Sequence, residues 1–200
     1  MYKSRNQGFT VIELVIVIVI LGLLAATAIP RFLNVTEEAE DASAEGMAGG
    51  LATAVSFVRS QWEVDGRRND EVTLDGTRIG LDTRFGFPTG TEANTDASAM
   101  DVNSCQAVFD RVLQNAPRNV VQGESAKGER IYITVQENGG GSVTGLDGTA
   151  VTVDLCRYHL VNSLTLSEAT GIPAPQNPGT TTGKGFTYNP GSGQVLVFKN

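Results

Sequence analysis

The sequence predicts an α+β protein, in which a long N-terminal helix precedes a head built on an antiparallel sheet. Two observations support this class. An apolar run near the N-terminus continues into a pattern with the period of an amphipathic helix, and the segments with strand character come later in the chain. The 200 residues, 40% of them hydrophobic, are enough for one ordinary domain and an anchor.

The first predicted element is an apolar helix from Phe9 to Ile29, which is 21 residues long and contains one charged residue, Glu13. At about 1.5 Å per residue, such a helix reaches roughly 31 Å, about the thickness of a bilayer's hydrocarbon core. The segment can therefore span a membrane. A carboxylate within such a helix costs about 2.5 to 3.5 kcal/mol and normally has a partner, so Glu13 needs an explanation.

After Pro30 the helix pattern becomes amphipathic. Apolar residues recur at spacings of three and four, which gives the helix one apolar face: Met47, Leu51, Val55, Val58 and Trp62. No proline lies between Pro30 and Pro88, so we expect the helix to reach about Gln61. Because Pro30 removes a helix hydrogen bond and Gly22 is a weak helix former, we predict that the helix can bend or partly unwind between them.

The rest of the chain shows strand patterns, turn signals and one short helical pattern. The predicted elements are one or two strands within 72–81, a helix over 105–113, a strand over 130–136 that ends at the glycines 139–141, a strand over 149–161, and a closing hairpin of 185–188 with 194–198. The strand over 149–161 is mostly apolar on both faces, as expected of a strand buried under the helix. Residues 171–184 are predicted to form an exposed loop.

The two cysteines, Cys105 and Cys156, lie in the part of the chain that follows the anchor. An exported segment is in an oxidising environment, and an even pair there favours a disulfide over a catalytic thiol. In the chain-entropy model a loop of this length stabilises the fold by about 4 kcal/mol.

Composition and motifs argue against several function classes. The formal net charge of -7 disfavours binding to nucleic acid phosphates. His159 is the single histidine and has no nucleophile at a recognisable spacing, and no cluster of metal ligands occurs, so we expect no enzyme activity, metal or cofactor. Residues 179–185 read G-T-T-T-G-K-G, which is one residue too short for a phosphate loop and lacks Ser or Thr after Lys184.

Three interpretations of the N-terminus compete. A secretory signal peptide would use the basic residues Lys3 and Arg5 and the A-x-A cleavage signal at 26–28, but its apolar region is normally shorter and uncharged. A plain membrane anchor leaves Glu13 unexplained. The third interpretation uses the motif itself: Gly8 followed by Phe9, with Glu13 four residues on and an unbroken apolar helix behind it, resembles the class III signal of type IV pilins and pseudopilins.

That resemblance implies a role for each motif residue. In the family a prepilin peptidase cuts after the glycine, here Gly8, and methylates the new N-terminus, here Phe9. The family glutamate falls on Glu13, where it pairs with the N-terminal amine of a neighbouring subunit. The resemblance also implies three parts: a leader (1–8), an apolar membrane and assembly helix (9–30), and a head (31–200) that includes the second half of the long helix. It further implies a disulfide in the C-terminal part of the head.

The leading functional hypothesis is therefore a structural subunit, the major pilin of a type IV pilus. Such a subunit is held in the inner membrane of a Gram-negative bacterium and then polymerises with its copies into an extracellular fibre, aided by an assembly platform and a cytoplasmic ATPase. The segments 30–34, 105–109 and 156–158 resemble mannose-sensitive haemagglutinin (MSHA) pilins, which implies surface adhesion and biofilm formation.

Two other classes remain as alternatives. A type II secretion pseudopilin shares the N-terminal signal, but the major pseudopilin would call for a calcium site of acidic residues near the C-terminus. After Cys156 this chain has no aspartate and a single glutamate, Glu168, which is too few oxygen ligands to favour such a site. A membrane-anchored enzyme is the third class, and it lacks a recognisable site.

Overall fold

A computed structural model of the chain describes residues 9–200. The predicted leader, residues 1–8 with its cleavage position at Gly8, lies outside the described residues. The chain forms two compact units, one that ends at Glu40 and one from Asp41 to Asn200. Both units contain part of the same helix.

The long N-terminal helix is confirmed: α1 runs from Val11 to Val64 with Pro30 inside it. It ends three residues beyond the predicted Gln61. The chain leaves the helix through Gly66, whose φ of 81° lies in the left-handed region that glycine adopts without strain.

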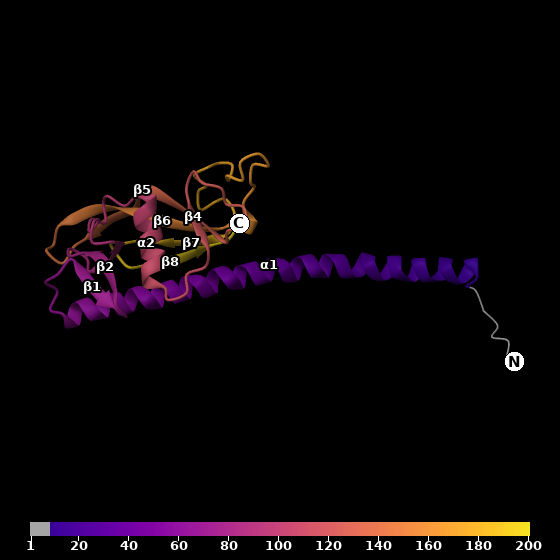
Figure 1. Cartoon of the computed structure of the whole chain (residues 1–200), viewed down its shortest axis with the longest axis horizontal. Helices are drawn as coiled ribbons and strands as arrows, with labels where there is room; N and C mark the ends of the chain where they lie inside the picture. Colours follow the sequence, from indigo (N-terminus) through magenta and orange to yellow (C-terminus); the bar gives the residue numbers. More distant parts are fainter. Residues whose placement is uncertain (1–8) are drawn as a thin grey trace. The chain divides into compact units, whose positions relative to one another are not determined.

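The head, Asp41–Asn200, contains two sheets and a second helix (Figure 1). The first sheet is antiparallel and consists of β1 (Glu71–Leu74), β2 (Thr77–Asp82) and β3 (Phe87–Gly90). Helix α2 (Val102–Val112) follows. The second sheet has the strand order β4-β5-β6-β7-β8, with bounds Asn119–Val121, Ile131–Thr144, Ala150–Leu160, Gly185–Tyr188 and Val195–Phe198, and a short 3-10 helix, η1 (Val161–Ser163), follows β6. The fold is the predicted α+β class.

Most strand predictions are confirmed, and one is wrong. The glycines at 139–141 do not end the strand: β5 continues to Thr144 after its register with β6 shifts between Gln136 and Gly141. The shift places three extra residues in β5, since β5 advances by five residues there and β6 by two. Gly140 fits this irregularity because an added Cβ would lie 2.6 Å from Val153 Cγ2. Strands β3 and β4 were not predicted, and β4 pairs parallel to β5 in a sheet whose other pairs are antiparallel.

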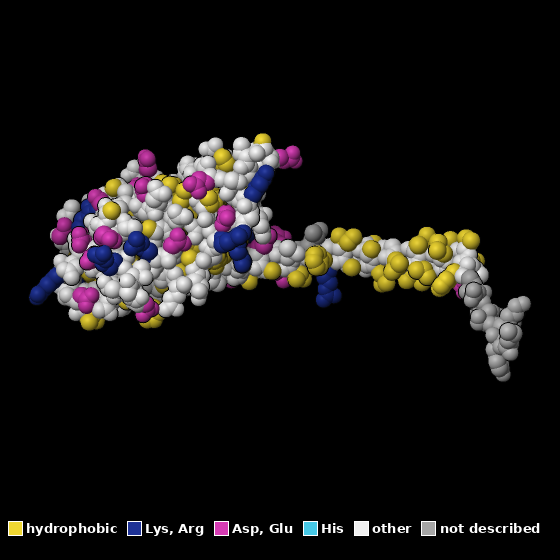
Figure 2. All heavy atoms as spheres, in the orientation of Figure 1, with side chains coloured by type: hydrophobic (Ala, Val, Ile, Leu, Met, Phe, Trp, Pro, Cys, Tyr) yellow, Lys and Arg dark blue, Asp and Glu magenta, His cyan; other side chains and the backbone are white. Residues whose placement is uncertain are grey.

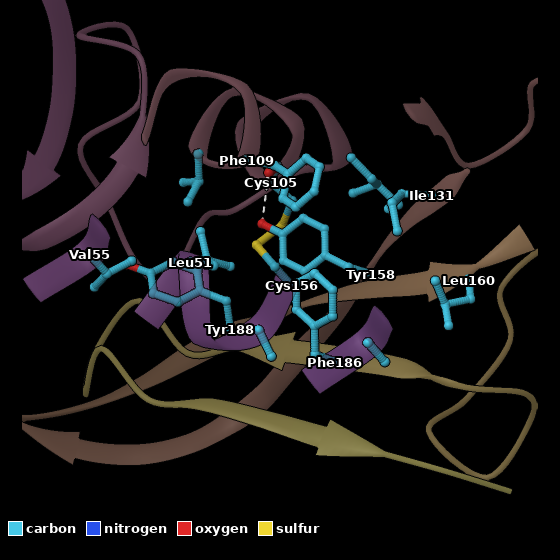
Figure 3. Packing of buried hydrophobic residues seen from close by; sticks show 14 of the residues in the cluster. Leu51, Val55, Cys105, Phe109, Ile131, Cys156, Tyr158, Leu160, Phe186 and Tyr188 are labelled. Carbon is cyan, nitrogen blue, oxygen red and sulfur yellow. Dashed lines mark hydrogen bonds between the residues drawn. A yellow bond between two sulfur atoms is a disulfide. The ribbon is translucent and has the colours of Figure 1, made fainter. Parts of the chain in front are cut away.

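The main core lies between the five-stranded sheet, the second half of α1, and α2. Alternate residues of β5, β6 and β7 point into it, together with Leu51 and Val55 of α1 (Figure 3). The ring of Tyr158 stacks between Phe109, at 5.0 Å, and Phe186, at 5.1 Å between centroids. Its hydroxyl donates a 2.8 Å hydrogen bond to the Cys105 carbonyl, and burial raises the pKa of Tyr158. The sheet is therefore packed against the helix, as predicted.

The predicted disulfide is confirmed. Cys105 in α2 and Cys156 in β6 are bonded, with a Cα–Cα distance of 5.5 Å, and both side chains are fully buried. The bond closes a loop between residues 51 apart in sequence and fixes α2 on the core face of the sheet (Figure 3).

We predict that removing this cross-link destabilises the head by about 4 kcal/mol, because the unfolded chain regains the entropy of the open loop. The measurement is the denaturant midpoint of the full chain in detergent, comparing wild type with the double variant Cys105→Ala/Cys156→Ala. Reduced wild-type protein is the control, since it keeps both sulfur atoms and lacks only the bond. A loss below about 1 kcal/mol in both samples would contradict the prediction.

An ion cluster joins the start of the head to its C-terminal hairpin. Asp41 and Glu45 lie on α1, while Lys184 and Lys199 flank strands β7 and β8. Lys184 Nζ lies 2.8 Å from Asp41 Oδ1, and Lys199 Nζ lies 2.7 Å from Glu45 Oε1 and 3.4 Å from Asp41 Oδ2. The hydrogen bond from Lys184 is the main cause that lowers the pKa of Asp41.

Because the folded pKa of Asp41 is lowered, the pair stabilises the head above the ordinary aspartate value of 3.8 and loses this effect as pH falls through the lowered value. We therefore expect Asp41→Asn to lower the denaturant midpoint at pH 7, and the difference from wild type to shrink at pH 3. Glu124→Gln is the matched control, because Glu124 is exposed and its loss should leave the midpoint unchanged. A difference that is the same at both pH values would refute this role for Asp41.

Candidate functional site: the apolar half of helix α1

The apolar half of α1 has no core to pack on within the described chain. Its large hydrophobic side chains from Phe9 to Ile29 are between 45% and 91% exposed. Figure 2 shows them gathered along this part of the helix, whereas the head surface carries charges of both signs. Among the described residues α1 is the one helix long and apolar enough to cross a membrane, with a mean hydropathy of 2.8 in its most apolar window. Water is a poor surrounding for such a surface.

Glu13 forms the N-terminal cap of the helix with Thr10. Its Oε2 accepts hydrogen bonds from the backbone N–H and the hydroxyl of Thr10, each at 2.8 Å, and its own N–H donates to Thr10 Oγ1 at 3.3 Å. Thr10 directly precedes the helix and Glu13 is its third residue, which is the spacing of a capping box. The spacing Thr10-x-x-Glu13 is a sequence signal for this cap, which was not among the predicted features.

The cap satisfies hydrogen bonds but does not neutralise Glu13. None of the ion pairs formed by the described residues includes this carboxylate. Its negative charge therefore still lacks a counter-charge within the described part of the chain, at the end of an apolar surface. A partner for that charge has to come from outside this region.

Gly22 and Pro30 lie within the continuous helix. A Cβ added to Gly22 would meet no other atom within 4 Å, so no side chain packs against this position. The bend predicted between Gly22 and Pro30 stays a prediction.

The described part of the head has a groove on its surface. This groove, about 990 Å³, lies between the outer side of α1, the β1–β2 turn and the end of α2. Two hydrogen bonds tie polar side chains of its lining in place: Asp75 accepts from Gln114 at 3.0 Å, and Arg111 donates to the Arg78 carbonyl at 2.7 Å. Among the described residues, no group of three or more His, Cys, Asp or Glu side chains is placed to hold a metal ion.

Comparisons with known proteins match this picture. Residues 3–29 match the family described as Prokaryotic N-terminal methylation motif. The Type IV narrow pilus major component PilA5 of Thermus thermophilus is 44% identical over 57 residues, which are 28% of this chain and 49% of that protein. A Fimbrial protein of Dichelobacter nodosus is 31% identical over 107 residues, covering 46% of this chain and 67% of that protein.

A third relative comes from a secretion system. The Type II secretion system core protein G of Pseudomonas aeruginosa is 31% identical over 90 residues, covering 45% of this chain and 57% of that protein. No solved structure shows significant similarity to the chain. The chain spans about half the length of the first curated relatives it matches.

The exposed apolar helix and the motif at its start define a class of proteins, those with a prokaryotic N-terminal methylation motif. Within that class the chain belongs to the type IV pilin family of fimbrial proteins, since it covers 67% of the D. nodosus fimbrial protein at 31% identity. The matched motif includes Gly8, Phe9 and Glu13.

We expect Thr10→Ala to weaken the first turn of α1 by about 1 kcal/mol, because it removes the capping hydroxyl. Amide hydrogen exchange of the full chain in detergent micelles should then be about fivefold faster at Glu13, whose N–H donates to Thr10 Oγ1, and at Leu14, whose N–H donates to the Thr10 carbonyl. Thr27→Ala is the control: the Thr27 hydroxyl donates to the Leu24 carbonyl inside the helix, so its removal should leave exchange at Glu13 and Leu14 unchanged. Equal exchange in Thr10→Ala and wild type would disprove the cap.

Proposed function

We propose that this protein is the major structural subunit of a type IV pilus and that it polymerises through the apolar half of α1. The observation that carries the proposal is the exposed apolar surface from Phe9 to Ile29 in a chain of the type IV pilin family. The relatives described above include a type IV pilus major component and a fimbrial protein. The proposed role is structural, without enzyme activity.

In this scheme the apolar half of α1 lies first in the membrane and then in the fibre. Each large apolar side chain removed from water contributes about 1.5 to 3 kcal/mol, so the segment is strongly driven out of water. The inner membrane supplies an apolar layer before assembly. Other copies of the same helix supply it in the fibre, so the driving force for leaving water is kept in both states.

Glu13 distinguishes the two states. In lipid, its charge has no opposite charge beside it, whereas in the fibre the N-terminal amine of a neighbouring copy can lie against it. Cleavage after Gly8 creates this amine on Phe9, and a methylated amine keeps its positive charge. Opposite charges attract strongly in a layer of low dielectric constant, so the pair favours the assembled state.

The resemblance of the N-terminal motif to that of type IV prepilins supports a division of the chain and a route of assembly. Residues 1–8 are the leader removed by a prepilin peptidase, 9–30 the membrane and assembly helix, and 31–200 the head. An inner-membrane platform and a cytoplasmic ATPase move the subunit from a Gram-negative inner membrane into an extracellular fibre. The helix between Gly22 and Pro30 yields when the fibre is formed or stretched.

We also propose an MSHA-like pilin, whose exposed head supports surface adhesion and biofilm formation. The support is the resemblance of residues 30–34, 105–109 and 156–158 to those pilins. The disulfide between Cys105 and Cys156 agrees with a pilin head stabilised by one cross-link.

A pseudopilin is the second candidate, and the secretion-system relative from P. aeruginosa favours it. Such a protein would act as a piston element in the cell envelope, not as a long surface fibre. The two functions therefore differ in where the mature chain is found.

The test is mass spectrometry of filaments sheared from cells that express the full chain. We expect the wild-type chain in these filaments, beginning at methylated Phe9. Glu13→Gln keeps a side chain that can complete the capping box but has no charge, so it should be inserted and processed but largely absent from filaments. Thr10→Ala is the matched control: it weakens the cap, keeps the Glu13 charge and should still assemble.

Other outcomes decide between the alternatives. A wild-type chain that is processed at Phe9 but absent from filaments supports the pseudopilin. A mature N-terminus at Ile29 indicates a conventional signal peptide, and an intact Met1 indicates a simple anchor. Normal filaments from Glu13→Gln would show that its charge is not needed for assembly.

A further inference from the structure

Residues 174–183, which lead into β7, cover part of the outer face of the five-stranded sheet, the face opposite the main core. We call this segment the cover. It contains no helix or strand. Side chains of the sheet hold it at two points: the Tyr132 hydroxyl donates to the Gln176 carbonyl at 2.8 Å, and Arg157 Nη2 donates to Asn177 Oδ1.

His159 of β6 lies beneath the cover and is completely buried. The groups packed around its ring are uncharged and come from three strands and the cover: Tyr132 of β5, Gly185 of β7, Phe198 of β8, and the backbone carbonyls of Pro178 and Thr182. Lys184 directly precedes β7, but its charge is paired with Asp41 of α1 at 2.8 Å. These neighbours therefore offer no negative charge to a protonated ring.

Arg157 places a positive charge on the same face. It lies two residues from His159 along β6, so both side chains point to the outer face, and it is 5% exposed. Two acceptors of its hydrogen bonds, the Val135 carbonyl and the Asn177 amide, are uncharged. The cover, 174–183, adds no compensating charge, because it contains no Asp, Glu, Lys or Arg. A proton on His159 would put a second buried positive charge near the first.

The proton affinity of His159 therefore differs between a covered and an uncovered ring. Burial is the main cause that lowers its pKa to about 4, and the charge of Arg157 adds to this, while the carbonyls of Thr182 and Pro178 act in the opposite direction and are outweighed. Once water reaches the ring, its pKa returns to the ordinary value of 6.5. The covered state thus has its full stability above pH 6.5 and loses it as the pH falls toward 4.

The cover can separate from the sheet without disrupting the main core. Its residues 174–177 are exposed, and Pro175 and Pro178 have no backbone N–H to donate. The side chains of the main core and the disulfide between Cys105 and Cys156 lie on the opposite face of the sheet. Segments with few buried contacts open locally at a lower free energy than the whole domain.

We propose that residues 174–183 form a pH-sensitive cover, which protonation of His159 releases from the outer face of the sheet. In the closed state the neutral ring lies on the same buried face as Arg157, away from water. In the open state the imidazolium and the guanidinium are both hydrated, so water screens the repulsion between them. The cover and His159 both belong to the head, so the test does not depend on filament formation.

The test is amide hydrogen exchange of the full chain in detergent at pH 7 and pH 5, corrected for the pH dependence of exchange in unstructured peptides. The reporter is Lys184 at the end of the cover, whose N–H donates to Ser163 Oγ at 2.8 Å. Its opening should be about 20-fold more frequent at pH 5, as the two pKa values of His159 require. The N–H of Gln122, which donates to the Ile133 carbonyl away from the cover, is the internal reference and should not change.

His159→Gln cannot take up this proton, so its Lys184 amide should open equally often at both pH values. Thr134→Val is the matched control: Thr134 is fully buried on the same face, and its replacement changes no charge, so the 20-fold rise of about that size should remain. Asp41 does not contribute between pH 7 and pH 5, because its pKa is lowered from 3.8 and its ion pair persists. The same rise in His159→Gln as in wild type would overturn the proposal, as would an equal rise at Gln122.

Nuclear magnetic resonance of the wild-type chain provides a second test that needs no variant, since His159 is the single histidine. Its ring should titrate well below pH 6.5, and the signals of Gln176 and Asn177 should move toward those of an unstructured peptide as it becomes protonated. A ring that titrates near pH 6.5, or one that is protonated while these cover signals stay unchanged, would contradict the release of the cover.

Discussion

The two halves of helix α1 have to suit different surroundings, and the rest of the structure depends on this constraint. In its second half α1 places Leu51, Val55 and Trp62 in the cores of the head. In its first half the large apolar side chains are exposed to whatever surrounds the protein. The head is therefore stable through its own core, disulfide and ion cluster, and the first half of the helix keeps its apolar surface available for lipid or for other copies.

Glu13 combines a local and a long-range role. Its hydrogen bonds to Thr10 organise the first turn of the helix, and this contact requires only residues three apart. Its charge is not neutralised by that contact, because threonine is uncharged. The same carboxylate can therefore fix the helix start in the single chain and still attract a positive charge from a neighbour.

Local patterns predicted the parts of the fold that depend on nearby residues. The sequence predicted the long helix from its period, the disulfide from the paired cysteines, and the closing hairpin from its turn residues. It also contains the signal for the Thr10–Glu13 cap, which was not predicted. Features set by distant contacts were not predictable. The register of β5 shifts at the glycine run, where Gly140 leaves room for the Val153 side chain of β6. The burial of Arg157 and His159 depends on a segment that returns over the sheet.

The ion cluster of Asp41 and Glu45 with Lys184 and Lys199 also has a mechanical consequence. A force applied along α1 reaches the head at Asp41, the first residue of this unit. The ion pairs of the two lysines connect this part of the helix to the ends of β7 and β8, in addition to the core contacts. Since β7 is paired with both β6 and β8, a force on the helix would reach the sheet through two routes, the ion pairs at its edge and the packed core beneath it.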